Sequence, residues 1–332
     1  MPSLNELLHA ASRTFAIGID LLPRPLREEV EIAYLLLRIS DYLEDNVIMA
    51  PARKAELLEL WAEVLAGEAS LETIEERLGE VREDTPDALV ARSLRQVLEG
   101  FGTLDPAARA VIARHVKDSS RGMARWALRG PDIGDEADLD DYMHEVAGRV
   151  GWLLTELFAA RVPAVDRRRE EMMALGREFG LALQTVNVIR GLHSDWERGW
   201  VYVPRSFAAG SGSAPAFSPA VRDPVLEQVV LARLVDKAAR HLEAARLYIS
   251  SIPRRRHGVR LFCLLPWFFA VRTLAVSRNN PRVFEEETKI GRGEVVRIVR
   301  AARLMGWSNG WVRWYARRLD AAGGPRRSVP SD

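Results

Sequence analysis

Three carboxylates lie close together in the segment DYLED, which runs from Asp41 to Asp45. Glu44 and Asp45 follow Asp41 by three and four residues, so a helix would place all three on one face. Like charges so close repel one another unless a cation neutralises them. Mg²⁺ binds through one or two carboxylates and keeps waters or substrate phosphates in its other positions. The spacing therefore predicts a magnesium site.

The residues around this acidic box are mostly apolar. Seven Ala, Ile and Leu residues fall between positions 32 and 43. A helix that is apolar nearly all round is mostly buried, and carboxylates on such a helix usually have a function. Arg38 shares the face of the box, and Tyr34 lies one turn further back. The alternative, a solvated acidic helix face, stays open on the residues alone.

The bulk composition excludes several classes of protein. The 332 residues carry 47 basic and 46 acidic side chains, a net charge of +1, which argues against general binding to nucleic acid. Cys263 is the single cysteine, so an intrachain disulfide and a cysteine zinc site are excluded and a reducing interior is expected. The apolar run Leu261–Val271 contains Pro266 and is far shorter than the roughly 20 residues that span a bilayer. We therefore expect a cytoplasmic protein that does not cross the membrane.

Helical periodicity runs through most of the chain, and the alternation typical of strands is nearly absent. We predict an all-α fold, with one domain over residues 1–320 and a disordered tail over 321–332. A segment rich in Gly, Ser, Ala and Pro, 205–220, predicts a mobile loop. The predicted helices are 26–46, 53–66, 88–101, 106–128, 138–161, 167–195, 224–250, 258–277 and 292–318.

Four segments resemble the family of squalene and phytoene synthases. Ser12 to Asp45 is similar to that family's Ser-basic-Ser/Thr-Phe start, followed by its Tyr, Arg and acidic box. Residues 142–151 (YMHEVAGRVG) resemble its Tyr-x-x-x-Val-Ala-Gly-x-Val-Gly helix, and 184–204 resemble its second metal-binding helix. Residues 262–293 look closest to the squalene synthase branch. The resemblance covers nearly the whole chain, and four ordered motifs are more specific than one acidic box.

The resemblance implies a single all-α isoprenoid-synthase domain with a central active-site cavity. It implies a transferase that condenses two prenyl diphosphates, most simply farnesyl diphosphate, head to head through a cyclopropyl diphosphate to squalene or a related C30 product. Asp41, Glu44 and Asp45 would hold Mg²⁺ against a substrate diphosphate, because metal ions and arginines neutralise the charge of the leaving group. The residues that would bind diphosphate are Ser12, Arg13, Thr14, Arg38, Gln184 and Arg190.

Three tyrosines are candidates for the reaction cavity. By the resemblance, Tyr142 lies near the reacting carbons and helps with proton transfer, while Tyr34 and Tyr248 line the cavity wall. The alternative for each is an amphipathic core residue whose hydroxyl group is hydrogen-bonded.

The second metal-binding helix departs from the family pattern. Gly191, Ser194 and Asp195 stand where the family shows an Asp-x-x-Glu-Asp box, so one of three carboxylates is present. Asn187 and Asp195 share a helical face and would hold a metal ion with additional waters. A weaker metal site, or a reaction that stops at the cyclopropyl diphosphate, follows from this departure.

The resemblance leaves the use of NADPH open, since squalene synthases consume it and phytoene and dehydrosqualene synthases do not. The cofactor candidates lie in the segment that resembles the reductive branch: Asn279, Asn280, Lys289 and Arg292. Gly291 replaces a usual basic residue there. The segment slightly favours an enzyme that uses NADPH to reduce the product.

The last predicted helix is strongly basic. Residues 289–318 hold eight basic residues and one acidic residue. Trp307, Trp311 and Trp314 follow one another at spacings of four and three, which predicts that they share one helical face. Such a helix can lie on an anionic membrane surface, which would suit delivery of a C30 or C40 product into lipid. Equally, the tryptophans could cap the core with the arginines outward.

Three rival functions stay open at this point. A phytoene-type C40 synthase differs only in cavity depth. A prenyltransferase that uses a non-prenyl acceptor would explain the altered second box. A catalytically inactive prenyl-lipid binding protein is opposed by the complete first box and its arginines.

Overall fold

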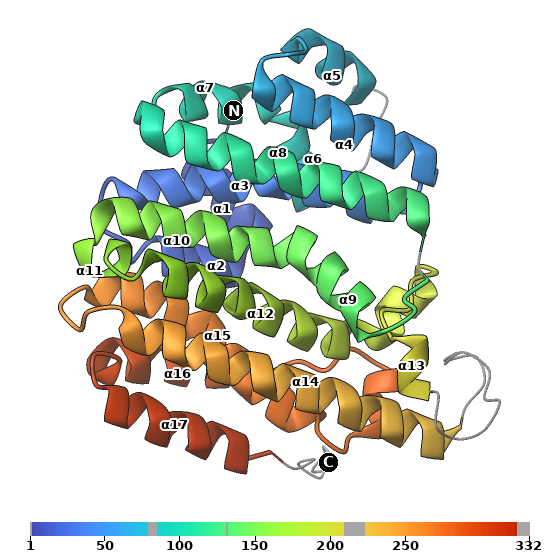
Figure 1. The fold of residues 1–332 in the computed structure, drawn as a ribbon, viewed down its shortest axis with the longest axis vertical. Helices are drawn as coiled ribbons and strands as arrows, with labels where there is room; N and C mark the ends of the chain where they lie inside the picture. Colours follow the sequence, from blue (N-terminus) through green and yellow to red (C-terminus); the bar gives the residue numbers. More distant parts are fainter. Residues whose placement is uncertain (1, 79–84, 131, 209–222, 324–332) are drawn as a thin grey trace, which may run out of the picture.

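The predicted all-α architecture is confirmed. The computed structural model describes residues 2–78, 85–130, 132–208 and 223–323, and no β-strand occurs in these ranges. Figure 1 shows long helices stacked roughly parallel to one another. Of the predicted loop 205–220, residues 205–208 form a short helix and the rest lies outside the described residues. Of the predicted tail, residues 324–332 lie outside them as well.

The helices account for nearly all of the described chain. They are α1 (Leu4–Ala11), α2 (Arg13–Ile19), α3 (Leu26–Asp45), α4 (Pro51–Ala66), α5 (Leu71–Leu78), α6 (Pro86–Arg92), α7 (Leu94–Gly102), α8 (Pro106–Arg129), α9 (Glu136–Met143), α10 (Arg149–Arg161), α11 (Pro163–Asp166), α12 (Arg169–Glu197), α13 (Arg205–Ala208), α14 (Pro224–Ser251), α15 (His257–Ser277), α16 (Arg292–Met305) and α17 (Asn309–Ala321). A π-helical turn (His144–Gly148) joins α9 to α10, and a 3₁₀ turn (Pro281–Phe284) follows α15.

Three predicted helices are interrupted. The segment 88–101 is divided at Ser93, which leaves helical geometry between α6 and α7. The segment 292–318 breaks at 306–308, where Gly306 ends α16 and the Ser308 side chain caps α17. The segment 138–161 contains the π-helical turn, a feature that side-chain periodicity does not reveal. Five short helices were not predicted: α1, α2, α5, α11 and α13.

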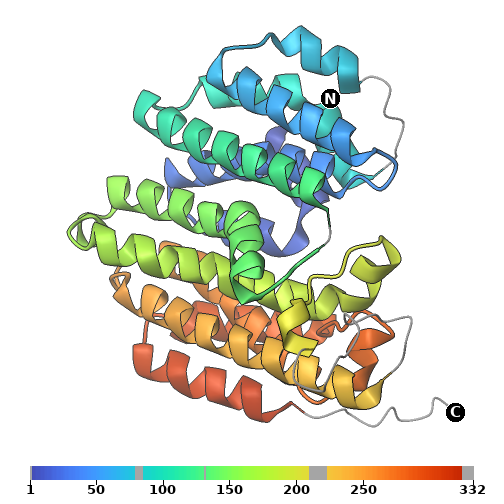
Figure 2. The ribbon, with the colours of Figure 1, turned by 45° about the vertical axis from the view of Figure 1, so that its right-hand side comes forward.

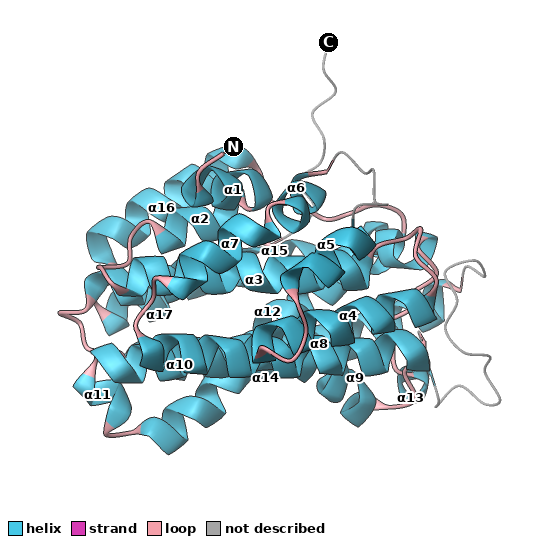
Figure 3. Ribbon diagram, turned by 90° about the horizontal axis from the view of Figure 1, so that it is seen from above, coloured by secondary structure: helices cyan, strands magenta, loops and turns pink. Residues whose placement is uncertain are grey.

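The helices form two layers that place α3 opposite α12. Seen from above, α8, α10 and α14 lie on one side and α3, α15 and α16 on the other (Figure 3). The turned view keeps the same order from α4 down to α17 (Figure 2). Helix α12 packs on α10, α14 and α15, and α3 packs on α8 and α4. This arrangement brings together the two segments that carry the predicted metal ligands.

Helix α15 forms part of the core. It is long and apolar enough by composition to cross a bilayer, but 94% of its most apolar window is buried inside the protein. Leu264, Leu265 and Phe268 have no exposed surface. Helices α16 and α17 both pack against it.

Two glycine contacts bring α10 and α12 unusually close. A Cβ atom on Gly151 would overlap the carbonyl oxygen of Gly176, and one on Gly180 would overlap that of Ala147. Helix packing therefore explains Gly151, which costs helix propensity. Gly148, in the π-helical turn, faces His144 and α12 in the same way.

The C-terminal tryptophans do not share one helical face, so that prediction was wrong. Trp307 lies in the turn before α17 and is 47% exposed, and Trp314 is 53% exposed. Trp311 instead stacks on Tyr315 at 4.7 Å and contacts the ring of Phe268. The break at Gly306 rotates Trp307 away from the register that a continuous helix would impose.

Candidate active site

The acidic box occupies the last turn of α3, where it is partly buried. Glu44 is 9% exposed, and the side chains of Asp41 and Asp45 are 33% and 53% exposed. Burial raises the pKa of Asp41 to about 6, although Arg38 opposes the shift. Burial, together with the charges of Asp45 and Asp41, raises the pKa of Glu44 to about 8. Neighbouring carboxylates thus disfavour the ionised forms of Asp41 and Glu44, and a divalent cation with oxygen preference would relieve this.

Arg198 connects the acidic box to the end of α12. Its Nη1 lies 3.1 Å from Asp45 Oδ1, and its Nη2 donates to Asp195. The Asp195 side chain is 13% exposed, and burial raises its pKa. Carboxylates from the two predicted metal-binding segments therefore share the guanidinium of Arg198, which is 153 residues from Asp45 in the chain.

A small cavity of about 170 Å³ opens beside this junction. Glu44, Asp45 and Arg198 line it, with Trp200 and Lys54. Lys54 donates from Nζ to the carbonyl oxygen of Glu44 at 2.6 Å, and so places a positive charge at the carboxyl end of α3. The cavity therefore combines carboxylates with cations, as a site for a metal and an anion requires.

Tyr142 is buried at the acidic box. Its hydroxyl oxygen lies 2.9 Å from that of Tyr202 and 3.3 Å from Glu44 Oε1. The two tyrosine rings stack at 4.6 Å, and Trp126 meets Tyr142 edge to face. Burial and the charge of Glu44 raise the pKa of both tyrosines, so both keep their protons near neutral pH.

The other two candidate tyrosines occupy different surroundings. Tyr34 is half-buried on α3, one turn before Arg38, and its ring lies 5.9 Å from that of Phe15. Tyr248 is fully packed, with its hydroxyl 3.0 Å from Thr155 Oγ1 and its ring 5.7 Å from that of Phe179. Tyr34 therefore shares the helix of the acidic box, whereas Tyr248 contacts α10 and α12.

The candidate diphosphate ligands on α2 and α3 lie at helix ends or in ion pairs. Ser12 caps α2 by accepting from the backbone N–H of Phe15 at 3.1 Å. Thr14 is exposed on the first turn, and the side chain of Arg13 lies outside the described residues. Arg38 donates to Asp41 and also donates two hydrogen bonds to Asp87 of α6.

The candidate residues of the second segment lie in the C-terminal part of α12. Asn187 Nδ2 donates to Gln184 Oε1 at 3.4 Å, and Arg190 Nε pairs with Glu287 at 3.2 Å. A Cβ atom on Gly191 would lie 2.9 Å from Asp195 Oδ2, so glycine leaves room for that carboxylate. Ser194 donates to the backbone of its own helix and is not turned outward.

The described residues contain no cluster of three or more His, Cys, Asp or Glu side chains that would cage a metal by themselves. Mg²⁺ seldom needs such a cage, because it keeps waters and takes phosphate oxygens from the substrate. Asp41, Glu44 and Asp45 on one side and Asp195 on the other supply the hard oxygen donors that it prefers. The donor set therefore fits Mg²⁺ bound together with diphosphate.

Known proteins are similar to this chain over most of its length. The model of the squalene/phytoene synthase family matches residues 8–294. The chain belongs to the squalene/phytoene synthase family. Squalene synthase of Schizosaccharomyces pombe is 30% identical over 301 residues, which cover 89% of this chain and 63% of that protein. Human squalene synthase is 29% identical over 306 residues, covering 90% and 69%. The chain thus spans about two thirds of the length of these curated relatives.

Solved structures of the squalene/phytoene synthase family have the same fold. A complex of TcSQS with the ligand BPH1237 superimposes with a TM-score of 0.78 at 25% identity, covering 98% of this chain and 92% of that one. A dehydrosqualene synthase in complex with a ligand gives 0.59 at 17% identity, covering 95% of each chain, and supports the fold alone.

The connection between α15 and α16 carries the candidate NADPH residues. Asn279 has a positive φ of 55°, and Asn280 caps the 3₁₀ turn by accepting from the backbone N–H of Arg282. Lys289 is exposed and pairs with Glu287 at 2.5 Å. Arg292 is exposed at the start of α16. Glu287 also pairs with Arg190, which ties this connection to α12.

Four side chains of the site were not assigned from the sequence. Asp87 gave no signal, because it lies outside every motif and pairs with Arg38 across 49 residues. Lys54 stood in an ordinary amphipathic pattern, and only its position next to the end of α3 gives it a role. Arg198 and Tyr202 lie in the segment 184–204, whose resemblance to the family was the available signal, but neither was assigned a role.

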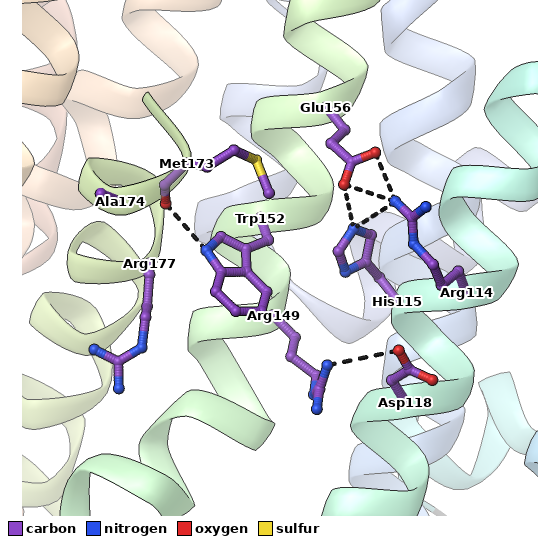
Figure 4. A pocket seen from close by; sticks show the side chains of 9 residues that line it. All are labelled: Arg114, His115, Asp118, Arg149, Trp152, Glu156, Met173, Ala174 and Arg177. Carbon is purple, nitrogen blue, oxygen red and sulfur yellow. Dashed lines mark hydrogen bonds and ion pairs between the residues drawn. The ribbon is translucent and has the colours of Figure 1, made fainter. Parts of the chain in front are cut away.

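A larger groove of about 610 Å³ crosses α8, α10 and α12 (Figure 4). Most of its charged groups pair with one another: Arg114 and His115 both bond to Glu156, and Arg149 lies 3.6 Å from Asp118. Arg177, also in the lining, pairs instead with Glu178. None of the predicted site residues lines it. The acidic box and this groove are therefore separate features.

Proposed function

We propose that the protein condenses two molecules of farnesyl diphosphate head to head and forms squalene or a closely related C30 product. The observation that carries the proposal is the junction at Arg198, which joins Asp45 of the first box to Asp195 of α12. The buried hydroxyl group of Tyr142 lies close to this junction and donates to Glu44 Oε1. Membership of the squalene/phytoene synthase family supports the same reaction.

The roles of the charged residues follow from the leaving group. Mg²⁺ bound by the five candidate ligands would neutralise the charge that develops on diphosphate. Arginine forks suit phosphate oxygens, and helix starts supply backbone N–H donors. We assign metal binding to Asp41, Glu44, Asp45, Asn187 and Asp195, and diphosphate binding to Ser12, Arg13, Thr14, Arg38, Gln184 and Arg190.

Proton transfer is assigned to Tyr142. Formation of the cyclopropane ring releases one diphosphate and one proton from the joined farnesyl chains. The Tyr142 hydroxyl, bonded to Tyr202 and close to Glu44, lies within a hydrogen-bonded chain that can take up and pass on a proton. The surrounding rings of Trp126 and Trp200 exclude water from this position.

The second half-reaction decides the product. With NADPH, hydride transfer to the rearranged cation gives squalene, NADP⁺ and a second diphosphate. We assign cofactor contact to the connection bearing Asn279, Asn280, Lys289 and Arg292. The altered second box, Gly191 and Ser194, favours as a second candidate an enzyme that stops at the cyclopropyl diphosphate.

Product analysis tests the proposal. Purified protein is incubated with farnesyl diphosphate and Mg²⁺, with and without NADPH, and products are identified by mass spectrometry. The expected result is a C30 product that disappears with Asp41→Ala and becomes squalene only when NADPH is present. A cyclopropyl diphosphate under both conditions would favour the second candidate. Turnover of geranylgeranyl diphosphate alone would indicate a C40 synthase, and no turnover of either would contradict the proposal.

We also propose that residues 1–320 act as one cytoplasmic domain that contacts an anionic membrane through α16 and α17. Trp307, Trp314 and Leu304 are 47%, 53% and 73% exposed there. The same two helices carry exposed arginines, among them Arg297, Arg300, Arg303, Arg313 and Arg317. Exposed aromatic and cationic side chains together suit the headgroup region of a bilayer.

Sedimentation with lipid vesicles tests this surface. The protein is expected to bind vesicles containing phosphatidylglycerol, and the double variant Trp307→Ser and Trp314→Ser is expected to bind roughly tenfold more weakly. Leu128→Ser, which removes a side chain 64% exposed on α8, is the matched control. Equal binding by the double variant and the wild type would contradict the assignment.

A further inference from the structure

Two carboxylates hold the guanidinium group of Arg38 at once. Its Nε and Nη2 donate to the two oxygens of Asp87 at 3.0 and 2.7 Å, the paired geometry in which arginine binds a carboxylate most strongly. Its Nη1 donates to Asp41 Oδ2 at 3.0 Å. Asp87 lies in the first turn of α6, which packs against α3. The arginine beside the acidic box is therefore bound by a helix that lies outside the four segments resembling squalene and phytoene synthases.

The two carboxylates are not equivalent. Within the described part of the chain, Arg38 is the only ion-pair partner of Asp87. The side chain of Arg38 is 26% exposed and that of Asp87 is 33% exposed. Asp41 belongs to the acidic box and receives one hydrogen bond from Arg38. Asp87 thus occupies the fork of the guanidinium and leaves its Nη1 edge facing the box.

We propose that Asp87 is a positioning residue for the diphosphate site, holding Arg38 so that the acidic box stays available to metal and substrate. The inference rests on the function proposed above. With Asp87 in place, Asp41 shares Arg38 through a single hydrogen bond and keeps its other oxygen for a cation. Without Asp87, the fork of Arg38 turns to its other carboxylate partner, Asp41, and occupies both of its oxygens.

Calorimetry with Mg²⁺ and inorganic pyrophosphate tests this without turnover. Asp87→Asn keeps the size of the side chain and removes its charge. The expected result is roughly tenfold weaker binding of pyrophosphate in the presence of Mg²⁺, because a charge-assisted bidentate pair has been lost. The Mg²⁺ concentration for half-maximal activity with farnesyl diphosphate should rise about fivefold, by the same argument. The melting temperature should change by only a few degrees.

A double variant separates positioning from a merely structural role. Lysine has no fork, so in the Arg38→Lys protein Asp87 has nothing to orient. Asp87→Asn should then add less than about twofold to the loss already caused by Arg38→Lys. Full additivity would overturn the proposal. Glu75→Gln is the matched control, because Glu75 is also 33% exposed and pairs with an arginine of another helix, Arg95, and its removal should leave binding unchanged.

The outcomes distinguish this inference from the proposed function. Wild-type protein that fails to bind pyrophosphate with Mg²⁺ contradicts the proposed function itself. If the wild type binds and Asp87→Asn binds as tightly or more tightly, only the role of Asp87 is overturned. If Asp87→Asn does not fold, Asp87→Glu displaces the carboxylate by one methylene and should still raise the Mg²⁺ requirement. An unchanged requirement in that variant would also overturn the inference.

Discussion

The hydroxyl group of Tyr142 links α9 to the acidic box and to Tyr202. We predict that Tyr142→Phe lowers kcat about 100-fold or more, within the range for loss of a group that transfers a proton. KM should change little, because the ring keeps its packing against Tyr202 and Trp126. Steady-state kinetics with farnesyl diphosphate measure both constants.

Tyr315→Phe is the control for loss of a tyrosine hydroxyl. Tyr315 stacks on Trp311 of α17 and has no contact with the acidic box. Its replacement should leave kcat unchanged. A Tyr142→Phe enzyme with full kcat would remove Tyr142 from the reaction and leave it a packing residue.

His144 predicts a dependence of stability on pH. Burial, followed by the charges of Arg177 and Arg149, lowers its pKa to about 4, and its buried Nδ1 has no hydrogen-bond partner among the described residues. In the unfolded chain a histidine has a pKa of about 6.5, so the unfolded state binds the proton first as pH falls. The contribution of His144 to stability should therefore be complete above pH ~7 and decline by roughly 1–3 kcal/mol towards pH 4.

Urea unfolding at pH 7.5, 5.5 and 4.5 measures this contribution. The wild type should lose more stability on acidification than His144→Gln, which cannot take up the proton. His115, whose pKa burial also lowers, is present in both proteins and cancels in the comparison. Parallel curves for the two proteins would show that His144 makes no such contribution.

For single residues, the sequence predicts those that recur every three or four positions and so share one face of a helix. The acidic box and Arg38 were found because three- and four-residue spacing puts them on one face. Asp87 was not found, because an ion pair across 49 residues leaves no periodic signal. The roles of the predicted residues stay predictions until the variants are measured.

Helices α10 and α12 depend on glycine for their contact. We predict that Gly151→Ala destabilises the protein by about 1–3 kcal/mol, because the added Cβ overlaps the Gly176 carbonyl and the helices must separate. Since α12 carries Asp195, activity should fall as well. Thermal and urea unfolding measure the first effect and kinetics the second.

Gly102→Ala provides the matched control for this prediction. Gly102 is the last residue of α7, and an added Cβ there would meet nothing within 4 Å. Its replacement should be neutral or stabilising by up to about 1 kcal/mol, since alanine restricts the unfolded chain. Equal effects at the two glycines would show that helix propensity, not packing, governs Gly151.

Element prediction succeeded where one amphipathic pattern fills one helix. α3, α8, α12, α14 and α15 begin and end within a few residues of the predicted bounds. It failed where two helices follow one another in compatible register, as on either side of Ser93 and Gly306. At Gly306 an added Cβ atom would lie 2.9 Å from Leu264 Cδ1 of α15, so this break accompanies close packing against a third helix, which a one-dimensional pattern does not contain.

The all-α class could be predicted for the whole molecule, but the meeting of α3 with α12 could not. Asp45 and Arg198 meet across 153 residues, and their approach depends on how α8, α10 and α12 stack. Only the family resemblance anticipated that the two segments would face one site. Periodicity fixes which face of each helix is buried and leaves the partner undetermined.

The buried side chain of Arg260 joins α14, α15, α16 and α17 at one end of these helices. Arg260 of α15 is fully buried and donates to the carbonyl oxygens of Ile249, Ile252 and Gly306, at the ends of α14 and α16. It also donates to Asn309 Oδ1 at the start of α17. We predict that Arg260→Met lowers the free energy of unfolding by about 2–4 kcal/mol, because it leaves several buried acceptors without donors.

We expect Arg260→Met to loosen α16 and α17 before the rest of the protein unfolds. Without Arg260, α16 and α17 lose the polar contacts at one end, whereas Arg272 of α15 still bonds to Glu294 and to the carbonyl oxygen of Leu319. The acidic box on α3 keeps its own contacts. Limited trypsin digestion should therefore cut the arginine-rich 292–318 segment first, and turnover should persist at temperatures below the lowered melting point. Arg255→Met, which replaces an exposed arginine in the turn before α15, should leave both digestion and melting unchanged. Cleavage spread evenly over the chain would show instead that the attachment at Arg260 is inseparable from the global core.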